Sequence, residues 1–583
     1  MTYRAPVSDI AFALFHSAGF GAALREGLYG DLGRDDVTAI LEEAARFAGD
    51  KIAPLNRTAD IAGTPFKDGA VTTPPGWKEA YTAWAAAGWN GLAAPAQWGG
   101  QDLPQAINAA CVEMWNAASM AFGVGPVLTM AAVDALAAYG SDDLKARYLG
   151  KLVSGEWTGT MELTEPQAGS DVGALRTRAE RAADGSYRIV GQKIFITYGE
   201  HDLTDNIIHF VLARLPDAPA GTKGISLFLV PKILPGSDGG PGRRNDLRAH
   251  SVEHKMGIHG SPTCTMIYGD HGGATGFLVG EEHKGMQAMF TMMNRARLAV
   301  GLQGVAIAER AMQQADAYAR ERKQGPRVIF DYPDVRRMLL TMRALTAAAR
   351  RLCYATAVAI DRSHRGRSEA ERRRANDRAS LLTPMAKAFS TDIGIEVASL
   401  GIQVHGGMGF IEETGAAQHY RDARIAAIYE GTNGIQAIDL LTRKLPLAGG
   451  ETVDAYLAEL RGIVGEIEAA NDPAFGTIGA RLTEALDGLA RAVAWLNAQT
   501  DKAAALCGAT PFLRLFASTA GGCMLAQDAL MAAREGSAAA ADAAGRVALA
   551  RFYADNIVIQ AQGLERMVVD GAASIVAADA ALA

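Results

Sequence analysis

The chain has 583 residues, 49% apolar and 21% charged, a balance typical of a globular protein with several domains rather than a disordered one. Residues 446–583 contain nine Lys and Arg but sixteen Asp and Glu, so this segment carries the whole formal charge of −7, which argues against nucleic-acid binding. The five scattered cysteines lack metal-ligand spacing, which favours structural thiols, no metal site and a reducing, cytoplasmic location.

Helical and strand patterns follow one another in large blocks. Apolar residues recur at helical spacing from Val37, short apolar runs separated by turns such as Asp184-Gly185 follow Trp157, and the helical period returns after Gly285. The fold class expected is α+β, mostly α. Its expected parts are an N-terminal extension (1–35), an N-terminal helical domain (36–157), a middle β-barrel or sandwich domain (158–280), a helical bundle (281–445) and an extra C-terminal helical domain (446–583).

One uncharged stretch, Met114–Val133, has the length of a membrane span. Polar residues interrupt it, and the break at Gly123–Pro126 favours two core helices joined by a turn, so we expect no membrane span. The first twenty residues lack a continuous apolar core, and we expect no signal peptide there. The Ala-rich stretch Ser537–Ala544 is typical of a loop.

Three stretches are candidates for a chemical role. The hydroxyls and amides of Leu163–Asp171 suit the edge of a flavin ring and a phosphate. The glycines of Gln403–Gly409 allow close approach to a pyrophosphate. In Ile428–Asn433, Glu430 ends an apolar run, and burial there raises a carboxyl pKa toward the range of a general base. Alone, each stretch is more typical of an ordinary turn or helix end.

The order of these stretches within a longer set is specific. The set contains TEPQAGSD (164–171), GQKIFITYG (191–199), KGISLFLVPK (223–232), RERK (320–323), QVHGGMGF (403–410), RDAR (421–424) and IYEGTNGIQ (428–436). In this order and spacing, residues 36–445 resemble the acyl-CoA dehydrogenase family. The additional C-terminal residues resemble its larger-subunit branch, which includes 3-methylmercaptopropionyl-CoA dehydrogenases and some long-chain enzymes.

The resemblance implies a noncovalent FAD between the β domain and the helical bundle. It places Leu163, Thr164, Phe195, Ile196 and Thr197 around the flavin ring. The other cofactor contacts that it implies are Ser170 at the pyrophosphate, Thr432 at the adenosine side, and Arg322, Gln403, Gly406 and Gly407 at the FAD of a neighbouring subunit. Cofactor sites shared in this way imply a homo-oligomer, with a dimer expected first.

The resemblance also implies the reaction. Glu430 removes the α-proton of an acyl-CoA thioester while hydride leaves the β-carbon for the flavin, and electrons pass on to an electron-transfer flavoprotein. Some family members carry the base on the helix that contains Arg297, but the matching residue here is Ala296, which strengthens the assignment of Glu430. The substrate contacts that we expect are Ser170, Arg297, Tyr429 and Gly431, with Arg297 supporting either the CoA arm or a core carboxylate.

The acyl group stays open at this point. The candidates are 3-methylmercaptopropionyl-CoA and the medium- or long-chain fatty acyl-CoAs of β-oxidation. An acyl-CoA oxidase of the same fold is an alternative reaction. A flavin-binding relative that binds DNA is a further alternative, and the acidic segment 446–583 argues against it.

Overall fold

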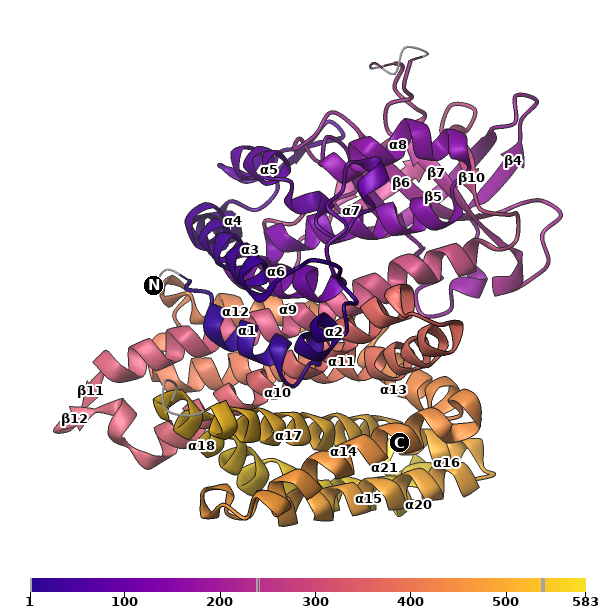
Figure 1. The fold of residues 1–583 in the computed structure, drawn as a ribbon. Helices are drawn as coiled ribbons and strands as arrows, with labels where there is room; N and C mark the ends of the chain where they lie inside the picture. Colours follow the sequence, from indigo (N-terminus) through magenta and orange to yellow (C-terminus); the bar gives the residue numbers. More distant parts are fainter. Residues whose placement is uncertain (1–2, 237–239, 241, 536–539) are drawn as a thin grey trace.

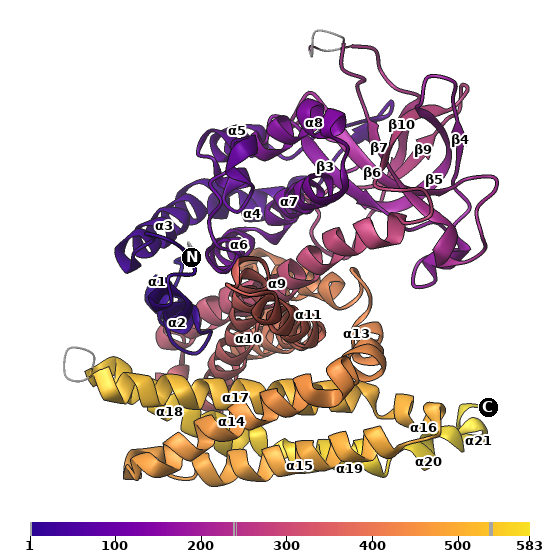
Figure 2. The same ribbon diagram turned by 45° about the vertical axis from the view of Figure 1, so that its right-hand side comes forward.

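The computed structural model describes residues 3–236, 240, 242–535 and 540–583, and these form three layers (Figure 1). The N-terminal helices and the β domain make the first layer, the long helices α9 to α11 make the central one, and the C-terminal helices make the third. The same order is seen in the rotated view (Figure 2). The mostly helical fold with a middle β domain, predicted from the sequence, is confirmed.

The N-terminal part is helical. Its helices are α1 (Val7–Phe15), α2 (Phe20–Arg25), α3 (Arg34–Phe47), α4 (Asn56–Ala62), α5 (Trp77–Ala86), α6 (Gln105–Ala118), α7 (Met120–Tyr139) and α8 (Asp142–Ser154). A short hairpin of β1 (Phe66–Lys67) and β2 (Ala70–Val71) follows α4. The first two helices belong to the predicted extension, and they pack against α10 of the central layer.

Helix α7 corrects one expectation. The predicted turn at Gly123–Pro126 was wrong, because α7 runs through Pro126 and the break from α6 falls at Ser119. The hydroxyl of Tyr198 donates to the carbonyl of Ala121, one residue before the Phe122 carbonyl that Pro126 leaves without its helical donor, so a tertiary contact braces this turn. Among the described residues, α7 is the one helix long and apolar enough to span a membrane, and 89% of its most apolar window is buried inside the protein.

The β domain is a closed barrel. Its strands are β3 (Thr158–Glu162), β4 (Arg178–Arg181), β5 (Tyr187–Thr197), β6 (Ile207–Arg214), β7 (Ile225–Pro231), β8 (Leu247–Val252), β9 (Thr263–Tyr268) and β10 (Ala274–Val279). Strand β10 closes the barrel because its first half pairs with β5 and its second half pairs with β7. The hairpin predicted at Asp184-Gly185 joins β4 to β5.

The central layer is built from α9 (Gly285–Glu321), α10 (Pro333–Arg365) and α11 (Glu369–His405), with α12 (Ala416–Ala423) and α13 (Asn433–Asp439) packed against α11. Helix α9 also packs against α6, α7 and β7, so it connects this layer to both N-terminal parts. Close helix contacts depend on small residues: a Cβ on Gly304 would lie 2.2 Å from the backbone oxygen of Ser390. A hairpin of β11 (Lys323–Gln324) and β12 (Arg327–Val328) projects from the end of α9.

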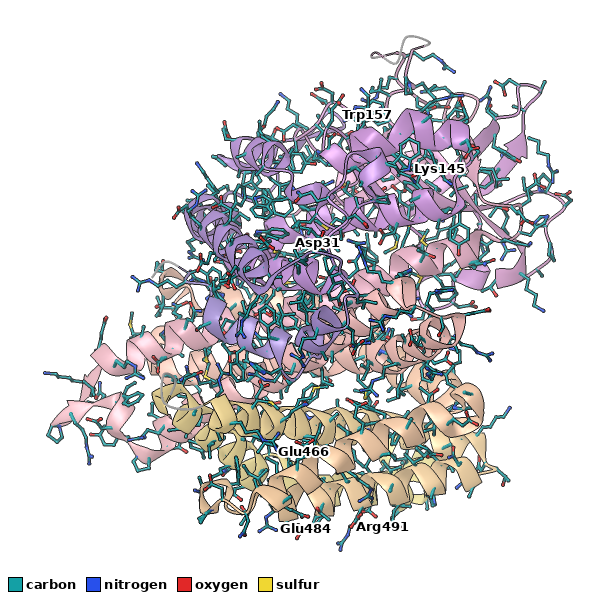
Figure 3. All side chains as sticks on the ribbon, viewed as in Figure 1. Asp31, Lys145, Trp157, Glu466, Glu484 and Arg491 are labelled. Carbon is teal, nitrogen blue, oxygen red and sulfur yellow. The ribbon has the colours of Figure 1, made fainter. Side chains whose placement is uncertain are left out.

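The C-terminal layer is a second helical bundle that packs against α10, α11 and α13. Its helices are α14 (Glu451–Ala470), α15 (Ile478–Ala498), α16 (Lys502–Cys507), α17 (Ala509–Glu535), α18 (Ala540–Asn556), α19 (Ala561–Val569), α20 (Ala572–Val576) and α21 (Asp579–Leu582). Glu484 and Arg491 point away from the central layer (Figure 3). Within the predicted loop 537–544, residues 537–539 lie outside the described residues; for the rest the prediction was wrong, since α18 begins at Ala540.

Candidate active site

Glu430 lies in an irregular turn, residues 428–432, that leads into α13. Two successive residues there have left-handed backbone conformations, with φ of 58° at Glu430 and 81° at Gly431. Glycine adopts this region freely, whereas a residue with a side chain is held there only by its surroundings. The hydroxyl of Thr432 accepts from the backbone N–H of Ile435 at 3.3 Å, so Thr432 caps α13 directly after the turn.

Two cationic side chains from the central helices face Glu430. Arg297 of α9 and Lys387 of α11 are both buried. Burial raises the pKa of Glu430 to about 7, and the two cations limit the rise. Burial also lowers the pKa of Lys387 to about 7, with Glu430 opposing it. A carboxyl group poised near neutrality can accept a proton at physiological pH, which is what a general base requires.

Hydrogen bonds hold the turn from three sides. The ammonium group of Lys387 donates to the carbonyl of Gly431 at 2.9 Å, and the amide of Gln436 donates to the carbonyl of Glu430 at 3.2 Å. The hydroxyl of Tyr429 donates to the side chain of Gln303 on α9. The sequence interpretation missed Lys387, Gln303 and Gln436. A detectable signal was the single cation of the run LLTPMAKAFST (381–391), which otherwise reads as a buried helix face.

The predicted flavin contacts of the barrel lie on two neighbouring segments. Leu163 and Thr164 directly follow β3, and the carbonyl of Thr164 accepts from the N–H of Ile194 at 3.0 Å. The buried pair Glu165 and Lys193, with 2.8 Å between carboxylate and ammonium, fixes this corner. Glu165 also accepts from the backbone N–H groups of Arg176 and Thr177, so it acts as a local cap.

The end of β5 carries the other flavin contacts. The pairing of β5 with β9 is irregular between Lys193 and Ile196, and Phe195 has φ of 61° at this point. The irregularity turns the ring of Phe195 outward, 59% exposed, while Ile196 is buried. Thr197 is the last residue of the strand and is partly buried.

The remaining predicted cofactor contacts lie elsewhere in the chain. Arg322 follows the end of α9, and Gln403, Gly406 and Gly407 lie at the end of α11. The rings of Tyr318 and His405 stack at 4.5 Å, so the two helix ends are adjacent. Arg322 is 25 residues beyond Arg297, which corresponds to about 37 Å along α9. One chain therefore presents the predicted FAD contacts as two separate groups.

The predicted substrate contacts divide in the same way. Arg297, Tyr429 and Gly431 surround Glu430, whereas Ser170 lies in the exposed loop after β3. A Cβ on Gly431 would lie 3.9 Å from a guanidinium nitrogen of Arg297, so Arg297 reaches the turn itself. Its Nε is buried and has no hydrogen-bond partner among the described residues. Of the two roles left open for Arg297, this geometry favours the one beside a buried carboxylate, that of Glu430.

Both groups of residues fit an FAD. Phe195 offers an exposed ring at the end of β5, where the flavin ring is expected. Cβ atoms built on Gly169, Gly406 and Gly407 would meet nothing within 4 Å, so these loops present open backbone, which a pyrophosphate requires. In the described part of the chain, no group of three or more His, Cys, Asp or Glu side chains is arranged to hold a metal ion.

Comparisons with known proteins agree with this geometry. Three acyl-CoA dehydrogenase domains match in order: the N-terminal domain at residues 34–156, the middle domain at 160–271 and the C-terminal domain at 283–445. Residues 456–579 match the family described as acetyl-CoA dehydrogenase C-terminal like. The chain belongs to the acyl-CoA dehydrogenase family, whose members are oxidoreductases acting on the CH–CH bond of an acyl-CoA. The predicted family and enzyme class are confirmed.

Full-length relatives extend this result. The chain is 46% identical to the 3-methylmercaptopropionyl-CoA dehydrogenase of Ruegeria pomeroyi, over 99% of this chain and 100% of the relative. It is 35% identical to a butyryl-CoA dehydrogenase of Syntrophomonas wolfei, over 95% of each chain. An acyl-CoA dehydrogenase from Bacillus anthracis, solved in complex with FAD, shares the fold, with a TM-score of 0.75, 21% identity, and coverage of 93% of this chain and 89% of that one.

Proposed function

We propose that this chain catalyses the FAD-dependent α,β-dehydrogenation of an acyl-CoA thioester to a trans-2-enoyl-CoA, with Glu430 as the base. The observation that carries the proposal is the turn at Glu430. A carboxylate is held there in a left-handed backbone conformation between two buried cations, with its pKa raised by burial to about 7. The position agrees with the family pattern, and no second carboxylate occupies the matching helix position at Ala296.

The chain supplies both parts of a proton abstraction. Glu430 takes the α-proton, and negative charge then develops on the thioester oxygen, which needs a preorganised donor. Within the described part of the chain, the backbone N–H of Glu430 has no hydrogen-bond acceptor, and we assign it to that oxygen. Arg297 adds positive charge beside the turn. After turnover the protonated carboxyl returns its proton to solvent.

FAD, when bound, accepts the hydride that leaves the β-carbon. We propose that Leu163, Thr164, Phe195, Ile196 and Thr197 hold the ring. The pyrophosphate and adenosine contacts proposed within this chain are Ser170 and Thr432. Because Arg322, Gln403, Gly406 and Gly407 lie at the far end of the bundle, they are available to the FAD of a second copy. A homodimer is therefore the smallest assembly that completes the proposed cofactor site.

The acyl group that we propose is short, and 3-methylmercaptopropionyl-CoA is the first substrate to test. The relative with that name matches along the whole chain at 46% identity, and the butyryl-CoA dehydrogenase matches nearly as completely. Both named substrates carry acyl groups with short backbones. We further propose an electron-transfer flavoprotein as the acceptor and a cytoplasmic location. The experiments below distinguish these proposals from a preference for longer acyl chains and from direct reoxidation by oxygen.

The experiment is anaerobic flavin bleaching with a panel of acyl-CoAs. The panel contains 3-methylmercaptopropionyl-CoA and straight chains from C4 to C16. We expect the fastest bleaching with the short members, and equal rates for C4 and C16 would contradict the short-chain proposal. The Glu430→Gln variant should retain its flavin and lose about 10³-fold or more in the bleaching rate, since a positioned base contributes on the order of 10²–10⁴. Full bleaching by this variant would remove the assignment of the base.

Reoxidation separates the two possible acceptors. Substrate-reduced enzyme is mixed either with air-saturated buffer or with an electron-transfer flavoprotein in a stopped-flow instrument. We expect slow reoxidation by oxygen and fast transfer to the flavoprotein. Fast reoxidation by oxygen alone would identify an oxidase instead.

A further inference from the structure

Helix α11 contains a fully buried lysine, Lys387. Lys387 is 0% exposed, and among the described residues no carboxylate lies within ion-pair distance of its ammonium group. Burying an ammonium group costs several kcal/mol unless hydrogen bonds or a counter-charge compensate. The proposed proton abstraction does not involve Lys387 directly, so another function must explain why this charge is buried.

The ammonium group bonds the segment that follows the base. It donates to the carbonyl of Gly431 at 2.9 Å and to Oδ1 of Asn433 at 2.8 Å. The amide nitrogen of Asn433 in turn donates to the carbonyl of Ala388 at 3.2 Å and to Asp392 at 2.7 Å. Lys387 and Asn433 therefore fasten the turn and the start of α13 to one point on α11.

The turn requires such support. Glu430 has a left-handed backbone, which is unfavourable for a residue with a side chain and persists only where surrounding contacts enforce it. Two side chains provide these contacts at the carbonyls: Gln436 bonds those of Glu430 and Gly431, and Lys387 bonds that of Gly431. Of the two, Lys387 alone also carries a charge toward the carboxylate.

We propose that Lys387 is a positioning residue for Glu430: its ammonium group holds the Glu430–Gly431 turn in the left-handed conformation and provides positive charge beside the catalytic carboxylate. This inference rests on the proposed role of Glu430 as the base and adds a residue that acts through it. Lys387 contacts the backbone after the base, so it acts on the direction of the carboxylate and on its charge state rather than on the substrate.

The other charged groups around the pair come from four elements: α9, α11, α13 and the short helix Leu440–Lys444 that follows α13. Arg297 of α9 faces both Glu430 and Lys387, and Asp392 of α11 faces Lys387. Asp439 and Arg443, which follow the turn, face Arg297. Tyr429 lies beside Glu430, and burial raises its pKa well above the ordinary value, so it stays neutral at working pH. Arg297 stays in place when Lys387 is substituted, so the carboxylate keeps one cation and the change has a limited size.

The test compares two neutral substitutions on the same turn. Lys387→Met removes the bonds to Gly431 and Asn433 and the charge, whereas Gln436→Met removes the bonds to the carbonyls of Glu430 and Gly431 and no charge. Both should lower kcat about tenfold or more, because a displaced base loses rate steeply. Lys387→Met alone should also move the acid limb of the kcat–pH profile upward by roughly one unit, the effect of losing a nearby opposite charge. Lys387→Arg, which keeps the charge, should leave the acid limb in place.

Three results would overturn the proposal. An unchanged kcat in Lys387→Met removes the positioning role, and acid limbs that move equally in both methionine variants remove the charge role. If Lys387→Met does not fold, Lys387→Gln, which removes the charge and shortens the donor, replaces it, and an unchanged kcat with an unmoved acid limb there overturns the proposal. Flavin content and melting temperature of each variant show that it is folded.

A titration of the Glu430 carboxyl, which needs no turnover, tests this inference independently of the proposed reaction. Glutamate labelled with ¹³C at the carboxyl carbon is incorporated, and the Glu430 signal is identified by its loss in Glu430→Gln. We expect this signal to titrate at higher pH in Lys387→Met than in the parent chain. If no acyl-CoA bleaches the parent enzyme, the proposed function fails while this titration still tests the coupling; an unmoved titration overturns the coupling alone.

Discussion

Two buried clusters of charge in this molecule differ in how completely their charges are compensated. Around Glu430, the carboxylate and the ammonium group of Lys387 both have pKa values near 7, because burial outweighs their attraction. Around Arg350, burial opposes the ionisation of Asp9, but Arg351, Arg350 and Arg546 outweigh it and hold its pKa well below the usual range. The first cluster can exchange a proton near neutral pH, whereas Asp9 of the second cluster stays ionised there.

The second cluster joins the layers of the fold. The guanidinium group of Arg350 on α10 bonds Glu113 of α6 and Glu309 of α9 at 2.7 Å, and Asp9 of α1 at 2.8 Å. Arg351 bonds Asp528 of α17 at 2.5 Å. One set of contacts thus reaches the N-terminal extension, the central helices and the C-terminal bundle. The partly compensated charges around Glu430 therefore suit proton transfer, whereas the ion pairs of the Arg350 cluster hold the layers together.

The largest expected effect is on the assembled cluster. Arg350→Met leaves Glu113 and Glu309 buried without their partner, which costs roughly 3–5 kcal/mol. We expect a lower urea midpoint and melting temperature, with kcat per folded flavin close to that of the parent. Circular dichroism and flavin fluorescence followed in urea measure this. An unchanged midpoint would show that the cluster contributes nothing to assembly.

Acid pH separates the clusters in one titration. Glu430 must be ionised to act, and the pH dependence of kcat/KM reports the free enzyme, so kcat/KM should fall about tenfold, or about 1.4 kcal/mol, for each pH unit below about 7. Asp9 has a depressed folded-state pKa, so its stabilisation is present above its unfolded value of about 4 and is lost only as the pH falls further. At pH 5 the protein should be folded and nearly inactive. Simultaneous loss of kcat/KM and of the circular dichroism signal would contradict the distinction between the two clusters.

The sequence identified candidates for the reacting groups more readily than the residues that hold them in position. Glu430, Phe195 and the glycines at 406 and 407 are visible because they lie in short motifs. Lys387 lies on α11, 43 residues before Glu430, and only the packing of α11 against α13, which follows the turn, brings them together. Likewise, the geometry that turns Phe195 outward depends on the irregular register of β5 with β9, which the local sequence does not specify.

The error at Pro126 has the same origin. Local rules place a turn at a Gly-Pro pair, because proline lacks the N–H that a helix needs. Tertiary contacts override them here: α7 is enclosed by α6, α8, α9 and β3, and Tyr198 bonds the carbonyl of Ala121. Helices and strands were therefore predictable where the local sequence pattern and the packing favour the same structure. They were not predictable where contacts with residues distant in the sequence determine the backbone conformation.

The smallest expected effect is at a charge pair outside both clusters. Arg491 on α15 bonds Glu565 of α19 through two nitrogens, at 2.6 and 2.8 Å, on the outer face of the C-terminal bundle (Figure 3). The Arg491 side chain is 61% exposed, so water screens the attraction and the pair contributes about 1 kcal/mol or less. Arg491→Gln should shift the urea midpoint far less than Arg350→Met, and raised salt should abolish the difference from the parent. Equal losses of stability in the two arginine variants would show that burial does not distinguish the Arg350 cluster from an exposed ion pair. The comparison of that cluster with Glu430 would then lose its physical basis.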